Sequence, residues 1–175
     1  MGSIKDTRNF NPFPGLRPFS PEESDLFFGR EAESGEVVDK LLRNKFVTVI
    51  GASGTGKSSL IYCGVIPKVK ISDNNNPESW KVITFRPGND PFSNLATAVS
   101  ENLHTTGNKP AEIDTLLLDL HLNNDGIAYT LKKHFSGKNE RILLVIDQFE
   151  ELFRYSTTSA GGDKGNQAAE FVAKV

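Results

Sequence analysis

The segment FVTVIGASGTGKSSL, residues 46–60, restricts the possible folds of this chain more than any other. Its first part, residues 46–50, is apolar and β-branched, which predicts a buried strand. Directly after it comes the pattern G-x-x-x-x-G-K-S at residues 51–58, the spacing of a phosphate-binding P-loop. The residues that follow predict a helix, so the motif has the strand-to-helix setting that its chemistry requires. The segment therefore predicts binding of a nucleoside triphosphate.

Each residue type in this loop has a physical reason. A polyphosphate needs several donors aimed at one point, and backbone amides supply them compactly when Gly51, Gly54 and Gly56 allow positive φ and close approach. The helix that begins near Lys57 adds the positive end of its dipole. We expect Lys57 to reach the β and γ phosphates and the Ser58 hydroxyl to bind Mg²⁺, a hard ion that prefers oxygen.

Composition narrows the class of protein. A length of 175 residues suits one domain or part of a larger protein, and a net charge of −2 gives no reason to expect nucleic acid or an anionic membrane as partner. The single cysteine, Cys63, excludes an internal disulfide and a zinc-binding cluster, and we interpret it as a small core residue. No apolar run approaches the roughly 20 residues of a transmembrane helix. We expect a cytoplasmic protein with no membrane contact.

Residues 1–25 differ from the rest of the chain because they hold four prolines, at positions 12, 14, 18 and 21. Prolines at this density disfavour regular helix and central strand. The apolar residues Phe10, Phe13, Leu16 and Phe19 predict an ordered, extended arm packed on the domain. Residues 26–175 then form the N-terminal part of the P-loop domain.

The segment LFFGREAE, residues 26–33, leads into a helix expected to run to about residue 44. Two interpretations of Phe27 and Phe28 stay open. They are core residues, or they flank a purine base together with the backbone of Gly29 and Arg30.

Further elements follow from periodicity. We expect a second strand over residues 80–85, ending at Arg86, whose charge either faces phosphates or is a solvated strand-end charge. The three histidines, His104, His121 and His134, have no metal-ligand spacing and are interpreted as surface or packing residues. The remaining predictions are helices over residues 58–65 (closed near Gly64 and Pro67), 91–103, 111–122 and 126–135 (capped by Asp125), a loop over 157–167 and a helix from 168.

The second informative segment is RILLVIDQF, residues 141–149. Its five consecutive aliphatic residues, 142–146, predict a strand buried on both faces of a parallel sheet. Asp147 lies where the strand ends, which is how P-loop enzymes place the carboxylate that orients magnesium. Of the two acids that follow, Glu150 and Glu151, one would position or deprotonate the attacking water. Spacing does not decide which of the two works, and we favour Glu150.

These motifs together carry a resemblance to a family. The segments NPFPGLRPF, FFGRE, GASGTGKSSL, FRPG and LLVIDQFEELF resemble the STAND class of NTPases, in the branch of bacterial and fungal regulators with a PGLRPF arm and a DQFEEL motif. The resemblance covers nearly all of residues 11–175 and also includes the related NACHT group. It implies ATP or ADP with Mg²⁺, and a switch that self-associates beside C-terminal helical, sensor and effector modules.

The resemblance also implies a role for each site residue. Phe28, Gly29 and Arg30 would lie at the adenine. Lys57, Asp147, Glu150 and Glu151 would be catalytic, and Ser58 and Asp147 would hold the metal. The phosphates would be bound by Gly51, Ala52, Ser53, Gly54, Thr55, Gly56, Lys57, Ser58 and Ser59.

The implied fold is α/β, a three-layer P-loop NTPase of the ASCE type with a parallel sheet of order 5-1-4-3-2. Only three convincing strands are present, over residues 46–50, 82–85 and 142–146. We therefore expect the chain to be truncated before the fourth and fifth strands, with unpaired strand edges as a consequence.

Three functions compete at this point. The first is a nucleotide-dependent switch with slow hydrolysis in the full-length protein, and the second is a nucleotide-binding scaffold without hydrolysis. The third is a kinase or motor ATPase, which the few basic residues between the two motifs disfavour. Retention of Lys57, Ser58, Asp147 and Glu150 favours the switch.

Overall fold

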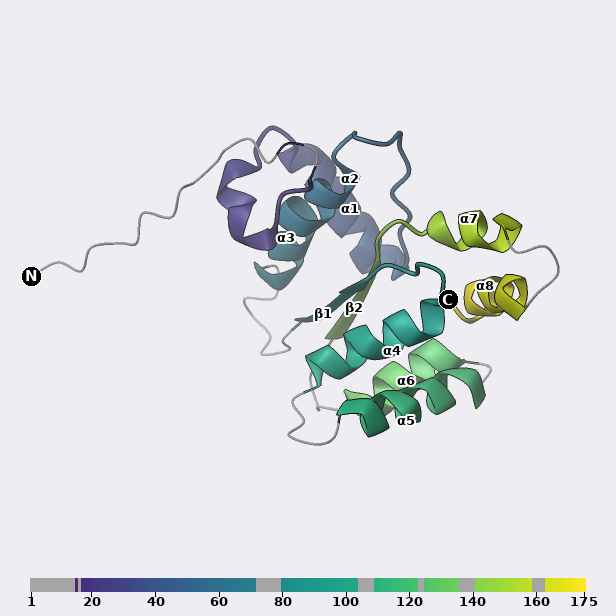
Figure 1. Ribbon diagram of the computed structural model, residues 1–175. Helices are drawn as coiled ribbons and strands as arrows, with labels where there is room; N and C mark the ends of the chain where they lie inside the picture. Colours follow the sequence, from purple (N-terminus) through teal and green to yellow (C-terminus); the bar gives the residue numbers. More distant parts are fainter. Residues whose placement is uncertain are drawn as a thin grey trace, which may run out of the picture. The chain divides into compact units, whose positions relative to one another are not determined.

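The computed structural model describes Gly15 and residues 17–71, 80–103, 109–122, 125–135, 141–158 and 163–175, with backbone only for residues 155–158 and 163–166. Most of the predicted N-terminal arm, including Phe10, Phe13 and Leu16, lies outside these residues. The chain divides into two compact units, Met1–Asn76 and Pro77–Val175. We describe each by itself; their elements are labelled in Figure 1.

The first unit holds the glycine-rich loop among helices. Its helix over Glu31–Asn44 has the apolar spacing predicted from the sequence. The helix is capped by the next residue, Lys45, which takes a left-handed conformation (φ 61°) and donates its N–H to the Leu41 carbonyl. At the end of the proline-rich arm, residues 21–26 form a short 3₁₀ helix, so the prediction that the arm contains no regular helix is wrong there. The elements are η1 (Pro21–Leu26), α1 (Glu31–Asn44), α2 (Lys57–Ser59), the π-helical η2 (Leu60–Val65) and α3 (Ile66–Ile71).

The helix after the loop is longer than predicted, because neither Gly64 nor Pro67 ends it and it continues to Ile71. A proline inside an α-helix normally clashes with the carbonyl four residues earlier. Here the preceding turn is π-helical, and Ile66 donates to the carbonyl of Ile61 five residues back. This wider turn accommodates Pro67 directly after it.

Residues 46–50 are not a strand, and that prediction is wrong. The segment forms no ladder with any described residue, and Phe46 and Ile50 are 65% and 88% exposed. Its apolar pattern favours an extended backbone, but a strand also needs a partner for its N–H and C=O groups. In the described part of the chain the sheet contains only two strands, and neither pairs with this segment.

The second unit is built on those two strands. The strands β1 (Trp80–Phe85) and β2 (Arg141–Ile146) are parallel neighbours, with Phe85 opposite Ile146. This adjacency agrees with the implied order, in which the second and third strands are neighbours. The helices are α4 (Pro91–Asn102), α5 (Lys109–Leu122), α6 (Gly126–His134), α7 (Glu151–Thr158) and α8 (Asp163–Lys174).

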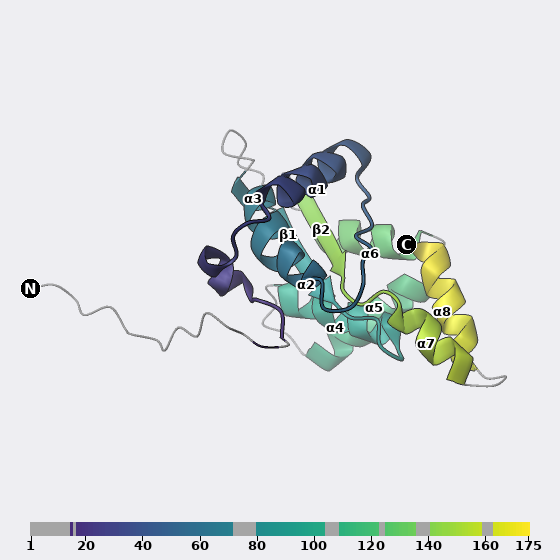
Figure 2. The ribbon, with the colours of Figure 1, turned by 90° about the horizontal axis from the view of Figure 1, so that it is seen from above.

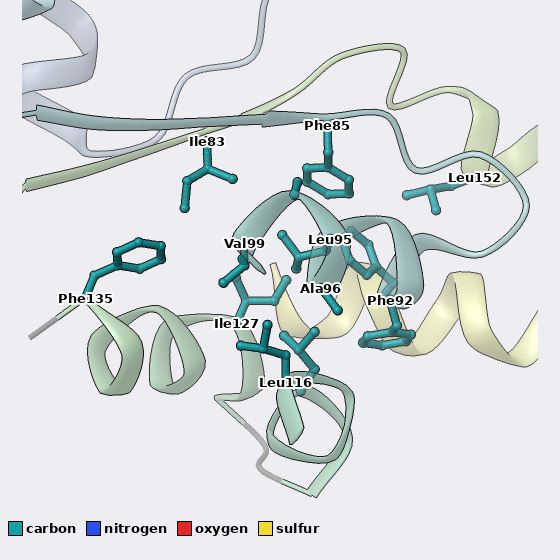
Figure 3. Close-up of a cluster of buried hydrophobic side chains, with 13 residues drawn as sticks. Ile83, Phe85, Phe92, Leu95, Ala96, Val99, Leu116, Ile127, Phe135 and Leu152 are labelled. Carbon is teal, nitrogen blue, oxygen red and sulfur yellow. The ribbon is translucent and has the colours of Figure 1, made fainter. Parts of the chain in front are cut away.

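The core of this unit lies between the sheet and α4 (Figure 3). Ile83 and Phe85 point from β1 toward α4, where Leu95 and Val99 meet them, and all four side chains are buried. The helix α5 packs on α4 and α6 packs on α5, and α7 and α8 lie side by side (Figures 1 and 2). Burial of these apolar side chains is the main source of stability for the unit.

Three predictions for this unit need correction. In β2 only Leu143 is buried and the other aliphatic residues are half-buried, because the strand pairs along one edge only among the described residues. The predicted loop over 157–167 is shorter, since α7 extends to Thr158 and α8 begins at Asp163. Asp125 precedes α6, but its side chain makes no capping hydrogen bond. Asp90 does cap its helix, accepting from the Ser93 amide.

Within the described residues, no helix is both long enough and apolar enough to cross a membrane.

Candidate functional site

The glycine-rich loop of the first unit has the backbone that the sequence predicts at two of its three glycines. Gly54 and Gly56 are left-handed, with φ of 79° and 77°. Gly51 is not, and its need for glycine is one of space: a Cβ there would lie 3.2 Å from Thr55 Oγ1 and 3.6 Å from Lys57 Cδ. Gly56 directly precedes the helix that starts at Lys57.

The ammonium group of Lys57 closes this loop. Its Nζ donates to the carbonyl oxygens of Gly51 at 2.8 Å and Ala52 at 3.0 Å. The Thr55 hydroxyl donates to the same Ala52 carbonyl at 2.8 Å. The ammonium group, the one positive charge of residues 51–58, is therefore held against the backbone of the loop.

The two serines after Lys57 have different surroundings. Ser59 is buried, and its hydroxyl oxygen accepts from the Phe19 amide at 3.1 Å, which fixes the chain before η1 to the helix. Ser58 is only half-buried. Ser53 is exposed at the tip of the loop.

The FFGRE segment separates the two phenylalanines. Phe27 packs edge-to-face on Phe19, with ring centroids 6.2 Å apart, whereas Phe28 is 77% exposed. Gly29 is left-handed (φ 86°), which favours glycine at this position. The guanidinium of Arg30 donates to the Thr55 carbonyl at 2.9 Å and to Glu33 at 3.1 Å, so in this structure it is directed to the loop.

In the second unit the predicted acid lies at the carboxyl end of the sheet. The Asp147 amide donates to the Phe85 carbonyl at 3.0 Å, which continues the ladder by one residue. Its carboxylate is paired with Arg86, whose Nε and Nη2 lie 3.2 and 3.1 Å from Oδ2. This pair agrees with the interpretation of Arg86 as a structural charge at the end of the strand.

The two glutamates that follow are not equivalent. Glu151 accepts from the Gly88 amide at 3.1 Å and so ties α7 to the turn after β1. Glu150 is exposed, and its carboxylate makes no hydrogen bond or ion pair with any described residue. A left-handed Gln148 (φ 56°) makes the sharp turn that brings both acids to the start of α7.

The comparison with protein families decides the class. The profile of the family "Novel STAND NTPase 1" matches residues 12–174. The chain belongs to this family. No curated protein and no solved structure matches it.

The donors of this STAND NTPase domain fit the groups that its family implies. The glycine-rich loop, in which Lys57 is held against the backbone and a Cβ at Gly51 would crowd Thr55, suits the phosphates of a nucleotide. Ser58 in the first unit and Asp147 in the second unit each carry a hard oxygen donor, the kind of ligand that Mg²⁺ prefers. Among the described residues no group of three or more His, Cys, Asp or Glu side chains could hold a metal by itself.

Sequence reasoning missed three contacts in this STAND domain: Arg30 to Thr55, Glu151 to Gly88, and Phe19 to Ser59. All three join a side chain to a backbone group far along the chain, and periodicity carries no signal for such pairs. The glycine of the FRPG segment was one available sequence signal for a tight turn. In the structure Gly88 is left-handed (φ 57°), as such a turn requires.

The interpretation of the cysteine is confirmed. Cys63 is buried, its thiol donates to the Ser20 carbonyl, and burial raises its pKa to about 11, so it is a packing residue. His121 packs against Phe92 with ring centroids 4.3 Å apart, whereas the Nε2 of His134 makes a polar contact with the Asp119 carboxylate at 3.0 Å. His104 lies outside the described residues.

Proposed function

We propose that this STAND NTPase domain binds ATP or ADP and acts as a nucleotide-dependent switch for self-association, with slow ATP hydrolysis in the full-length protein. The observation that carries the proposal is the position of Lys57, whose ammonium is held by the Gly51 and Ala52 carbonyls. A polyphosphate is the ligand that can take over these contacts, because it offers anionic oxygens to Lys57 and accepts from the loop amides at once.

A switch needs a ligand that distinguishes two states of the protein. A triphosphate and a diphosphate differ in the oxygens that they offer to Lys57, so they would favour different arrangements of the residues around it. Nucleotide exchange can shift the population only by this difference in affinity. In the proposed switch, the triphosphate state exposes the surface that self-associates, together with helical, sensor and effector modules elsewhere in the protein.

The acidic residues would supply the hydrolytic step. Mg²⁺, when bound with the nucleotide, neutralises charge on the phosphates, and Ser58 and Asp147 are the residues that would hold it. Glu150 is the acid we assign to water, because Glu151 is already engaged by the Gly88 amide. An exposed carboxylate that accepts a proton from water can contribute about 10²- to 10⁴-fold to the rate.

Calorimetric titration with ATP, ADP and GTP in the presence of magnesium tests the binding step. We expect micromolar affinity for adenine nucleotides, no signal for GTP, and loss of binding in Lys57→Ala. Lys70→Ala is the matched control, because Lys70 is an exposed lysine of the same helical run. Binding that survives Lys57→Ala would refute the proposal.

One observation favours the scaffold without hydrolysis as the second candidate. The Asp147 carboxylate is paired with Arg86, and this pairing must be exchanged before Asp147 can serve a metal ion. Phosphate release by the full-length protein separates the two functions. Nucleotide binding with no release above that of Glu150→Gln would favour the scaffold.

A further inference from the structure

Arg30 of the FFGRE segment contacts the backbone of the glycine-rich loop in this structure. Its Nη1 donates to the Thr55 carbonyl across 25 positions of the sequence, at 2.9 Å. Its Nε is held by Glu33 at 3.1 Å, one turn into α1. The side chain is about one-third exposed, so the loop contact is partly shielded from water.

The Thr55 carbonyl belongs to the same peptide plane as the Gly56 amide. In a trans peptide the C=O and N–H bonds point in opposite directions. By holding this carbonyl, Arg30 fixes the direction of the Gly56 N–H, which then points away from the guanidinium. Gly56 has φ of 77°, and because glycine takes positive and negative φ with similar ease, a contact to the preceding carbonyl can bias it toward this conformation.

We infer that Arg30 is a positioning residue for the phosphate-binding loop rather than a contact to the base. It fixes the orientation of the Thr55–Gly56 peptide, and thereby a loop amide available to phosphate. The inference rests on the proposed function in one respect, the identity of the ligand. It implies that Arg30 affects every ligand with a polyphosphate group equally, whatever base the ligand carries.

Three ligands separate the two roles: inorganic tripolyphosphate, ATP and GTP, each titrated into the wild type, Arg30→Ala and Arg30→Lys. We expect Arg30→Ala to weaken tripolyphosphate and ATP by the same factor, about tenfold for one charge-assisted hydrogen bond, with the ATP-to-GTP ratio unchanged. Arg30→Lys should recover part of this loss because it keeps the charge. Lys40→Ala is the matched control, since it removes an ion-paired cation from the exposed face of the same helix.

Hydrogen exchange of residues 51–60 without any ligand is the second measurement. Arg30→Ala should increase exchange in this segment, while exchange in α4 of the other unit and in Lys40→Ala stays at the wild-type level. Unchanged exchange would overturn the inference. So would a loss of ATP binding in Arg30→Ala that spares tripolyphosphate and alters the ATP-to-GTP ratio, because that pattern identifies a base contact. A wild type that binds none of the three ligands would refute the proposed function, and the exchange measurement would still decide the role of Arg30.

Discussion

The guanidinium of Arg86 holds the carboxylate of Asp147, with two nitrogens at 3.1 and 3.2 Å from a single oxygen. The strand register explains this pair. Phe85 and Ile146 are opposite each other, so Arg86 and Asp147 follow the carboxyl ends of two neighbouring parallel strands. Asp147 is only 12% exposed, whereas Arg86 is 51% exposed, so removal of the arginine leaves a largely buried charge.

Arg86→Ala should lower the free energy of unfolding, because the Asp147 carboxylate then loses its counter-charge. A double-mutant cycle with Asp147→Asn should give a coupling energy of about 0.5–1 kcal/mol, the upper range for a pair with one exposed partner. Urea unfolding of the four proteins measures it. Strictly additive effects would show that the pair contributes nothing to stability.

The two glutamates should separate into a hydrolytic and a structural residue. Glu150→Gln should reduce phosphate release by the full-length protein about 100-fold without changing stability. Glu151→Ala should cost about 1 kcal/mol of stability by removing the acceptor of the Gly88 amide, whereas Glu151→Gln keeps an acceptor oxygen there. The reverse assignment would appear as a rate loss in Glu151→Gln with Glu150→Gln active.

Gly64 is required for the contact between α1 and η2. A Cβ at this position would overlap Ser34 Oγ, and the Ser34 side chain is 1% exposed and has no free space. Gly64→Ala should therefore destabilise the protein by about 1–3 kcal/mol in thermal or urea unfolding.

Gly35 provides the control for that substitution. It lies within α1, and a Cβ there would meet nothing within 4 Å. Gly35→Ala should stabilise the protein by about 0.5–1 kcal/mol, through the higher helix propensity of alanine. Similar losses for both variants would show that close packing at Gly64 is not the cause.

Stability should fall at acid pH in part through Asp119. The Lys133 ammonium, at 2.8 Å, and then His134 lower the pKa of this carboxyl below its usual value. A lowered folded-state pKa means that the contribution is present above the unfolded pKa of about 3.9 and is lost as the pH falls through the folded value. Urea unfolding between about pH 6 and pH 2 should show the wild-type advantage over Asp119→Asn shrinking below about pH 4.

The local features of this fold were largely readable in the chain. The apolar spacing of α1, the start of α4 at Pro91, and the two runs that form β1 and β2 all lie where their patterns predicted. The two exceptions depend on features outside the local pattern. Residues 46–50 have the pattern of a strand but no partner among the described residues, and the helix through Pro67 is permitted by a π turn that no pattern announces.

The sequence by itself determined the class of this protein, because the loop GASGTGKSS and the end of β2 at Asp147 are contiguous motifs whose chemistry depends on adjacent residues. Only the tertiary structure decided which side chains are engaged. It directed Arg30 to Thr55, Arg86 to Asp147 and Glu151 to Gly88. Each of these contacts joins residues at least 25 positions apart, and such pairs are set by how the elements pack, not by any local propensity of the chain.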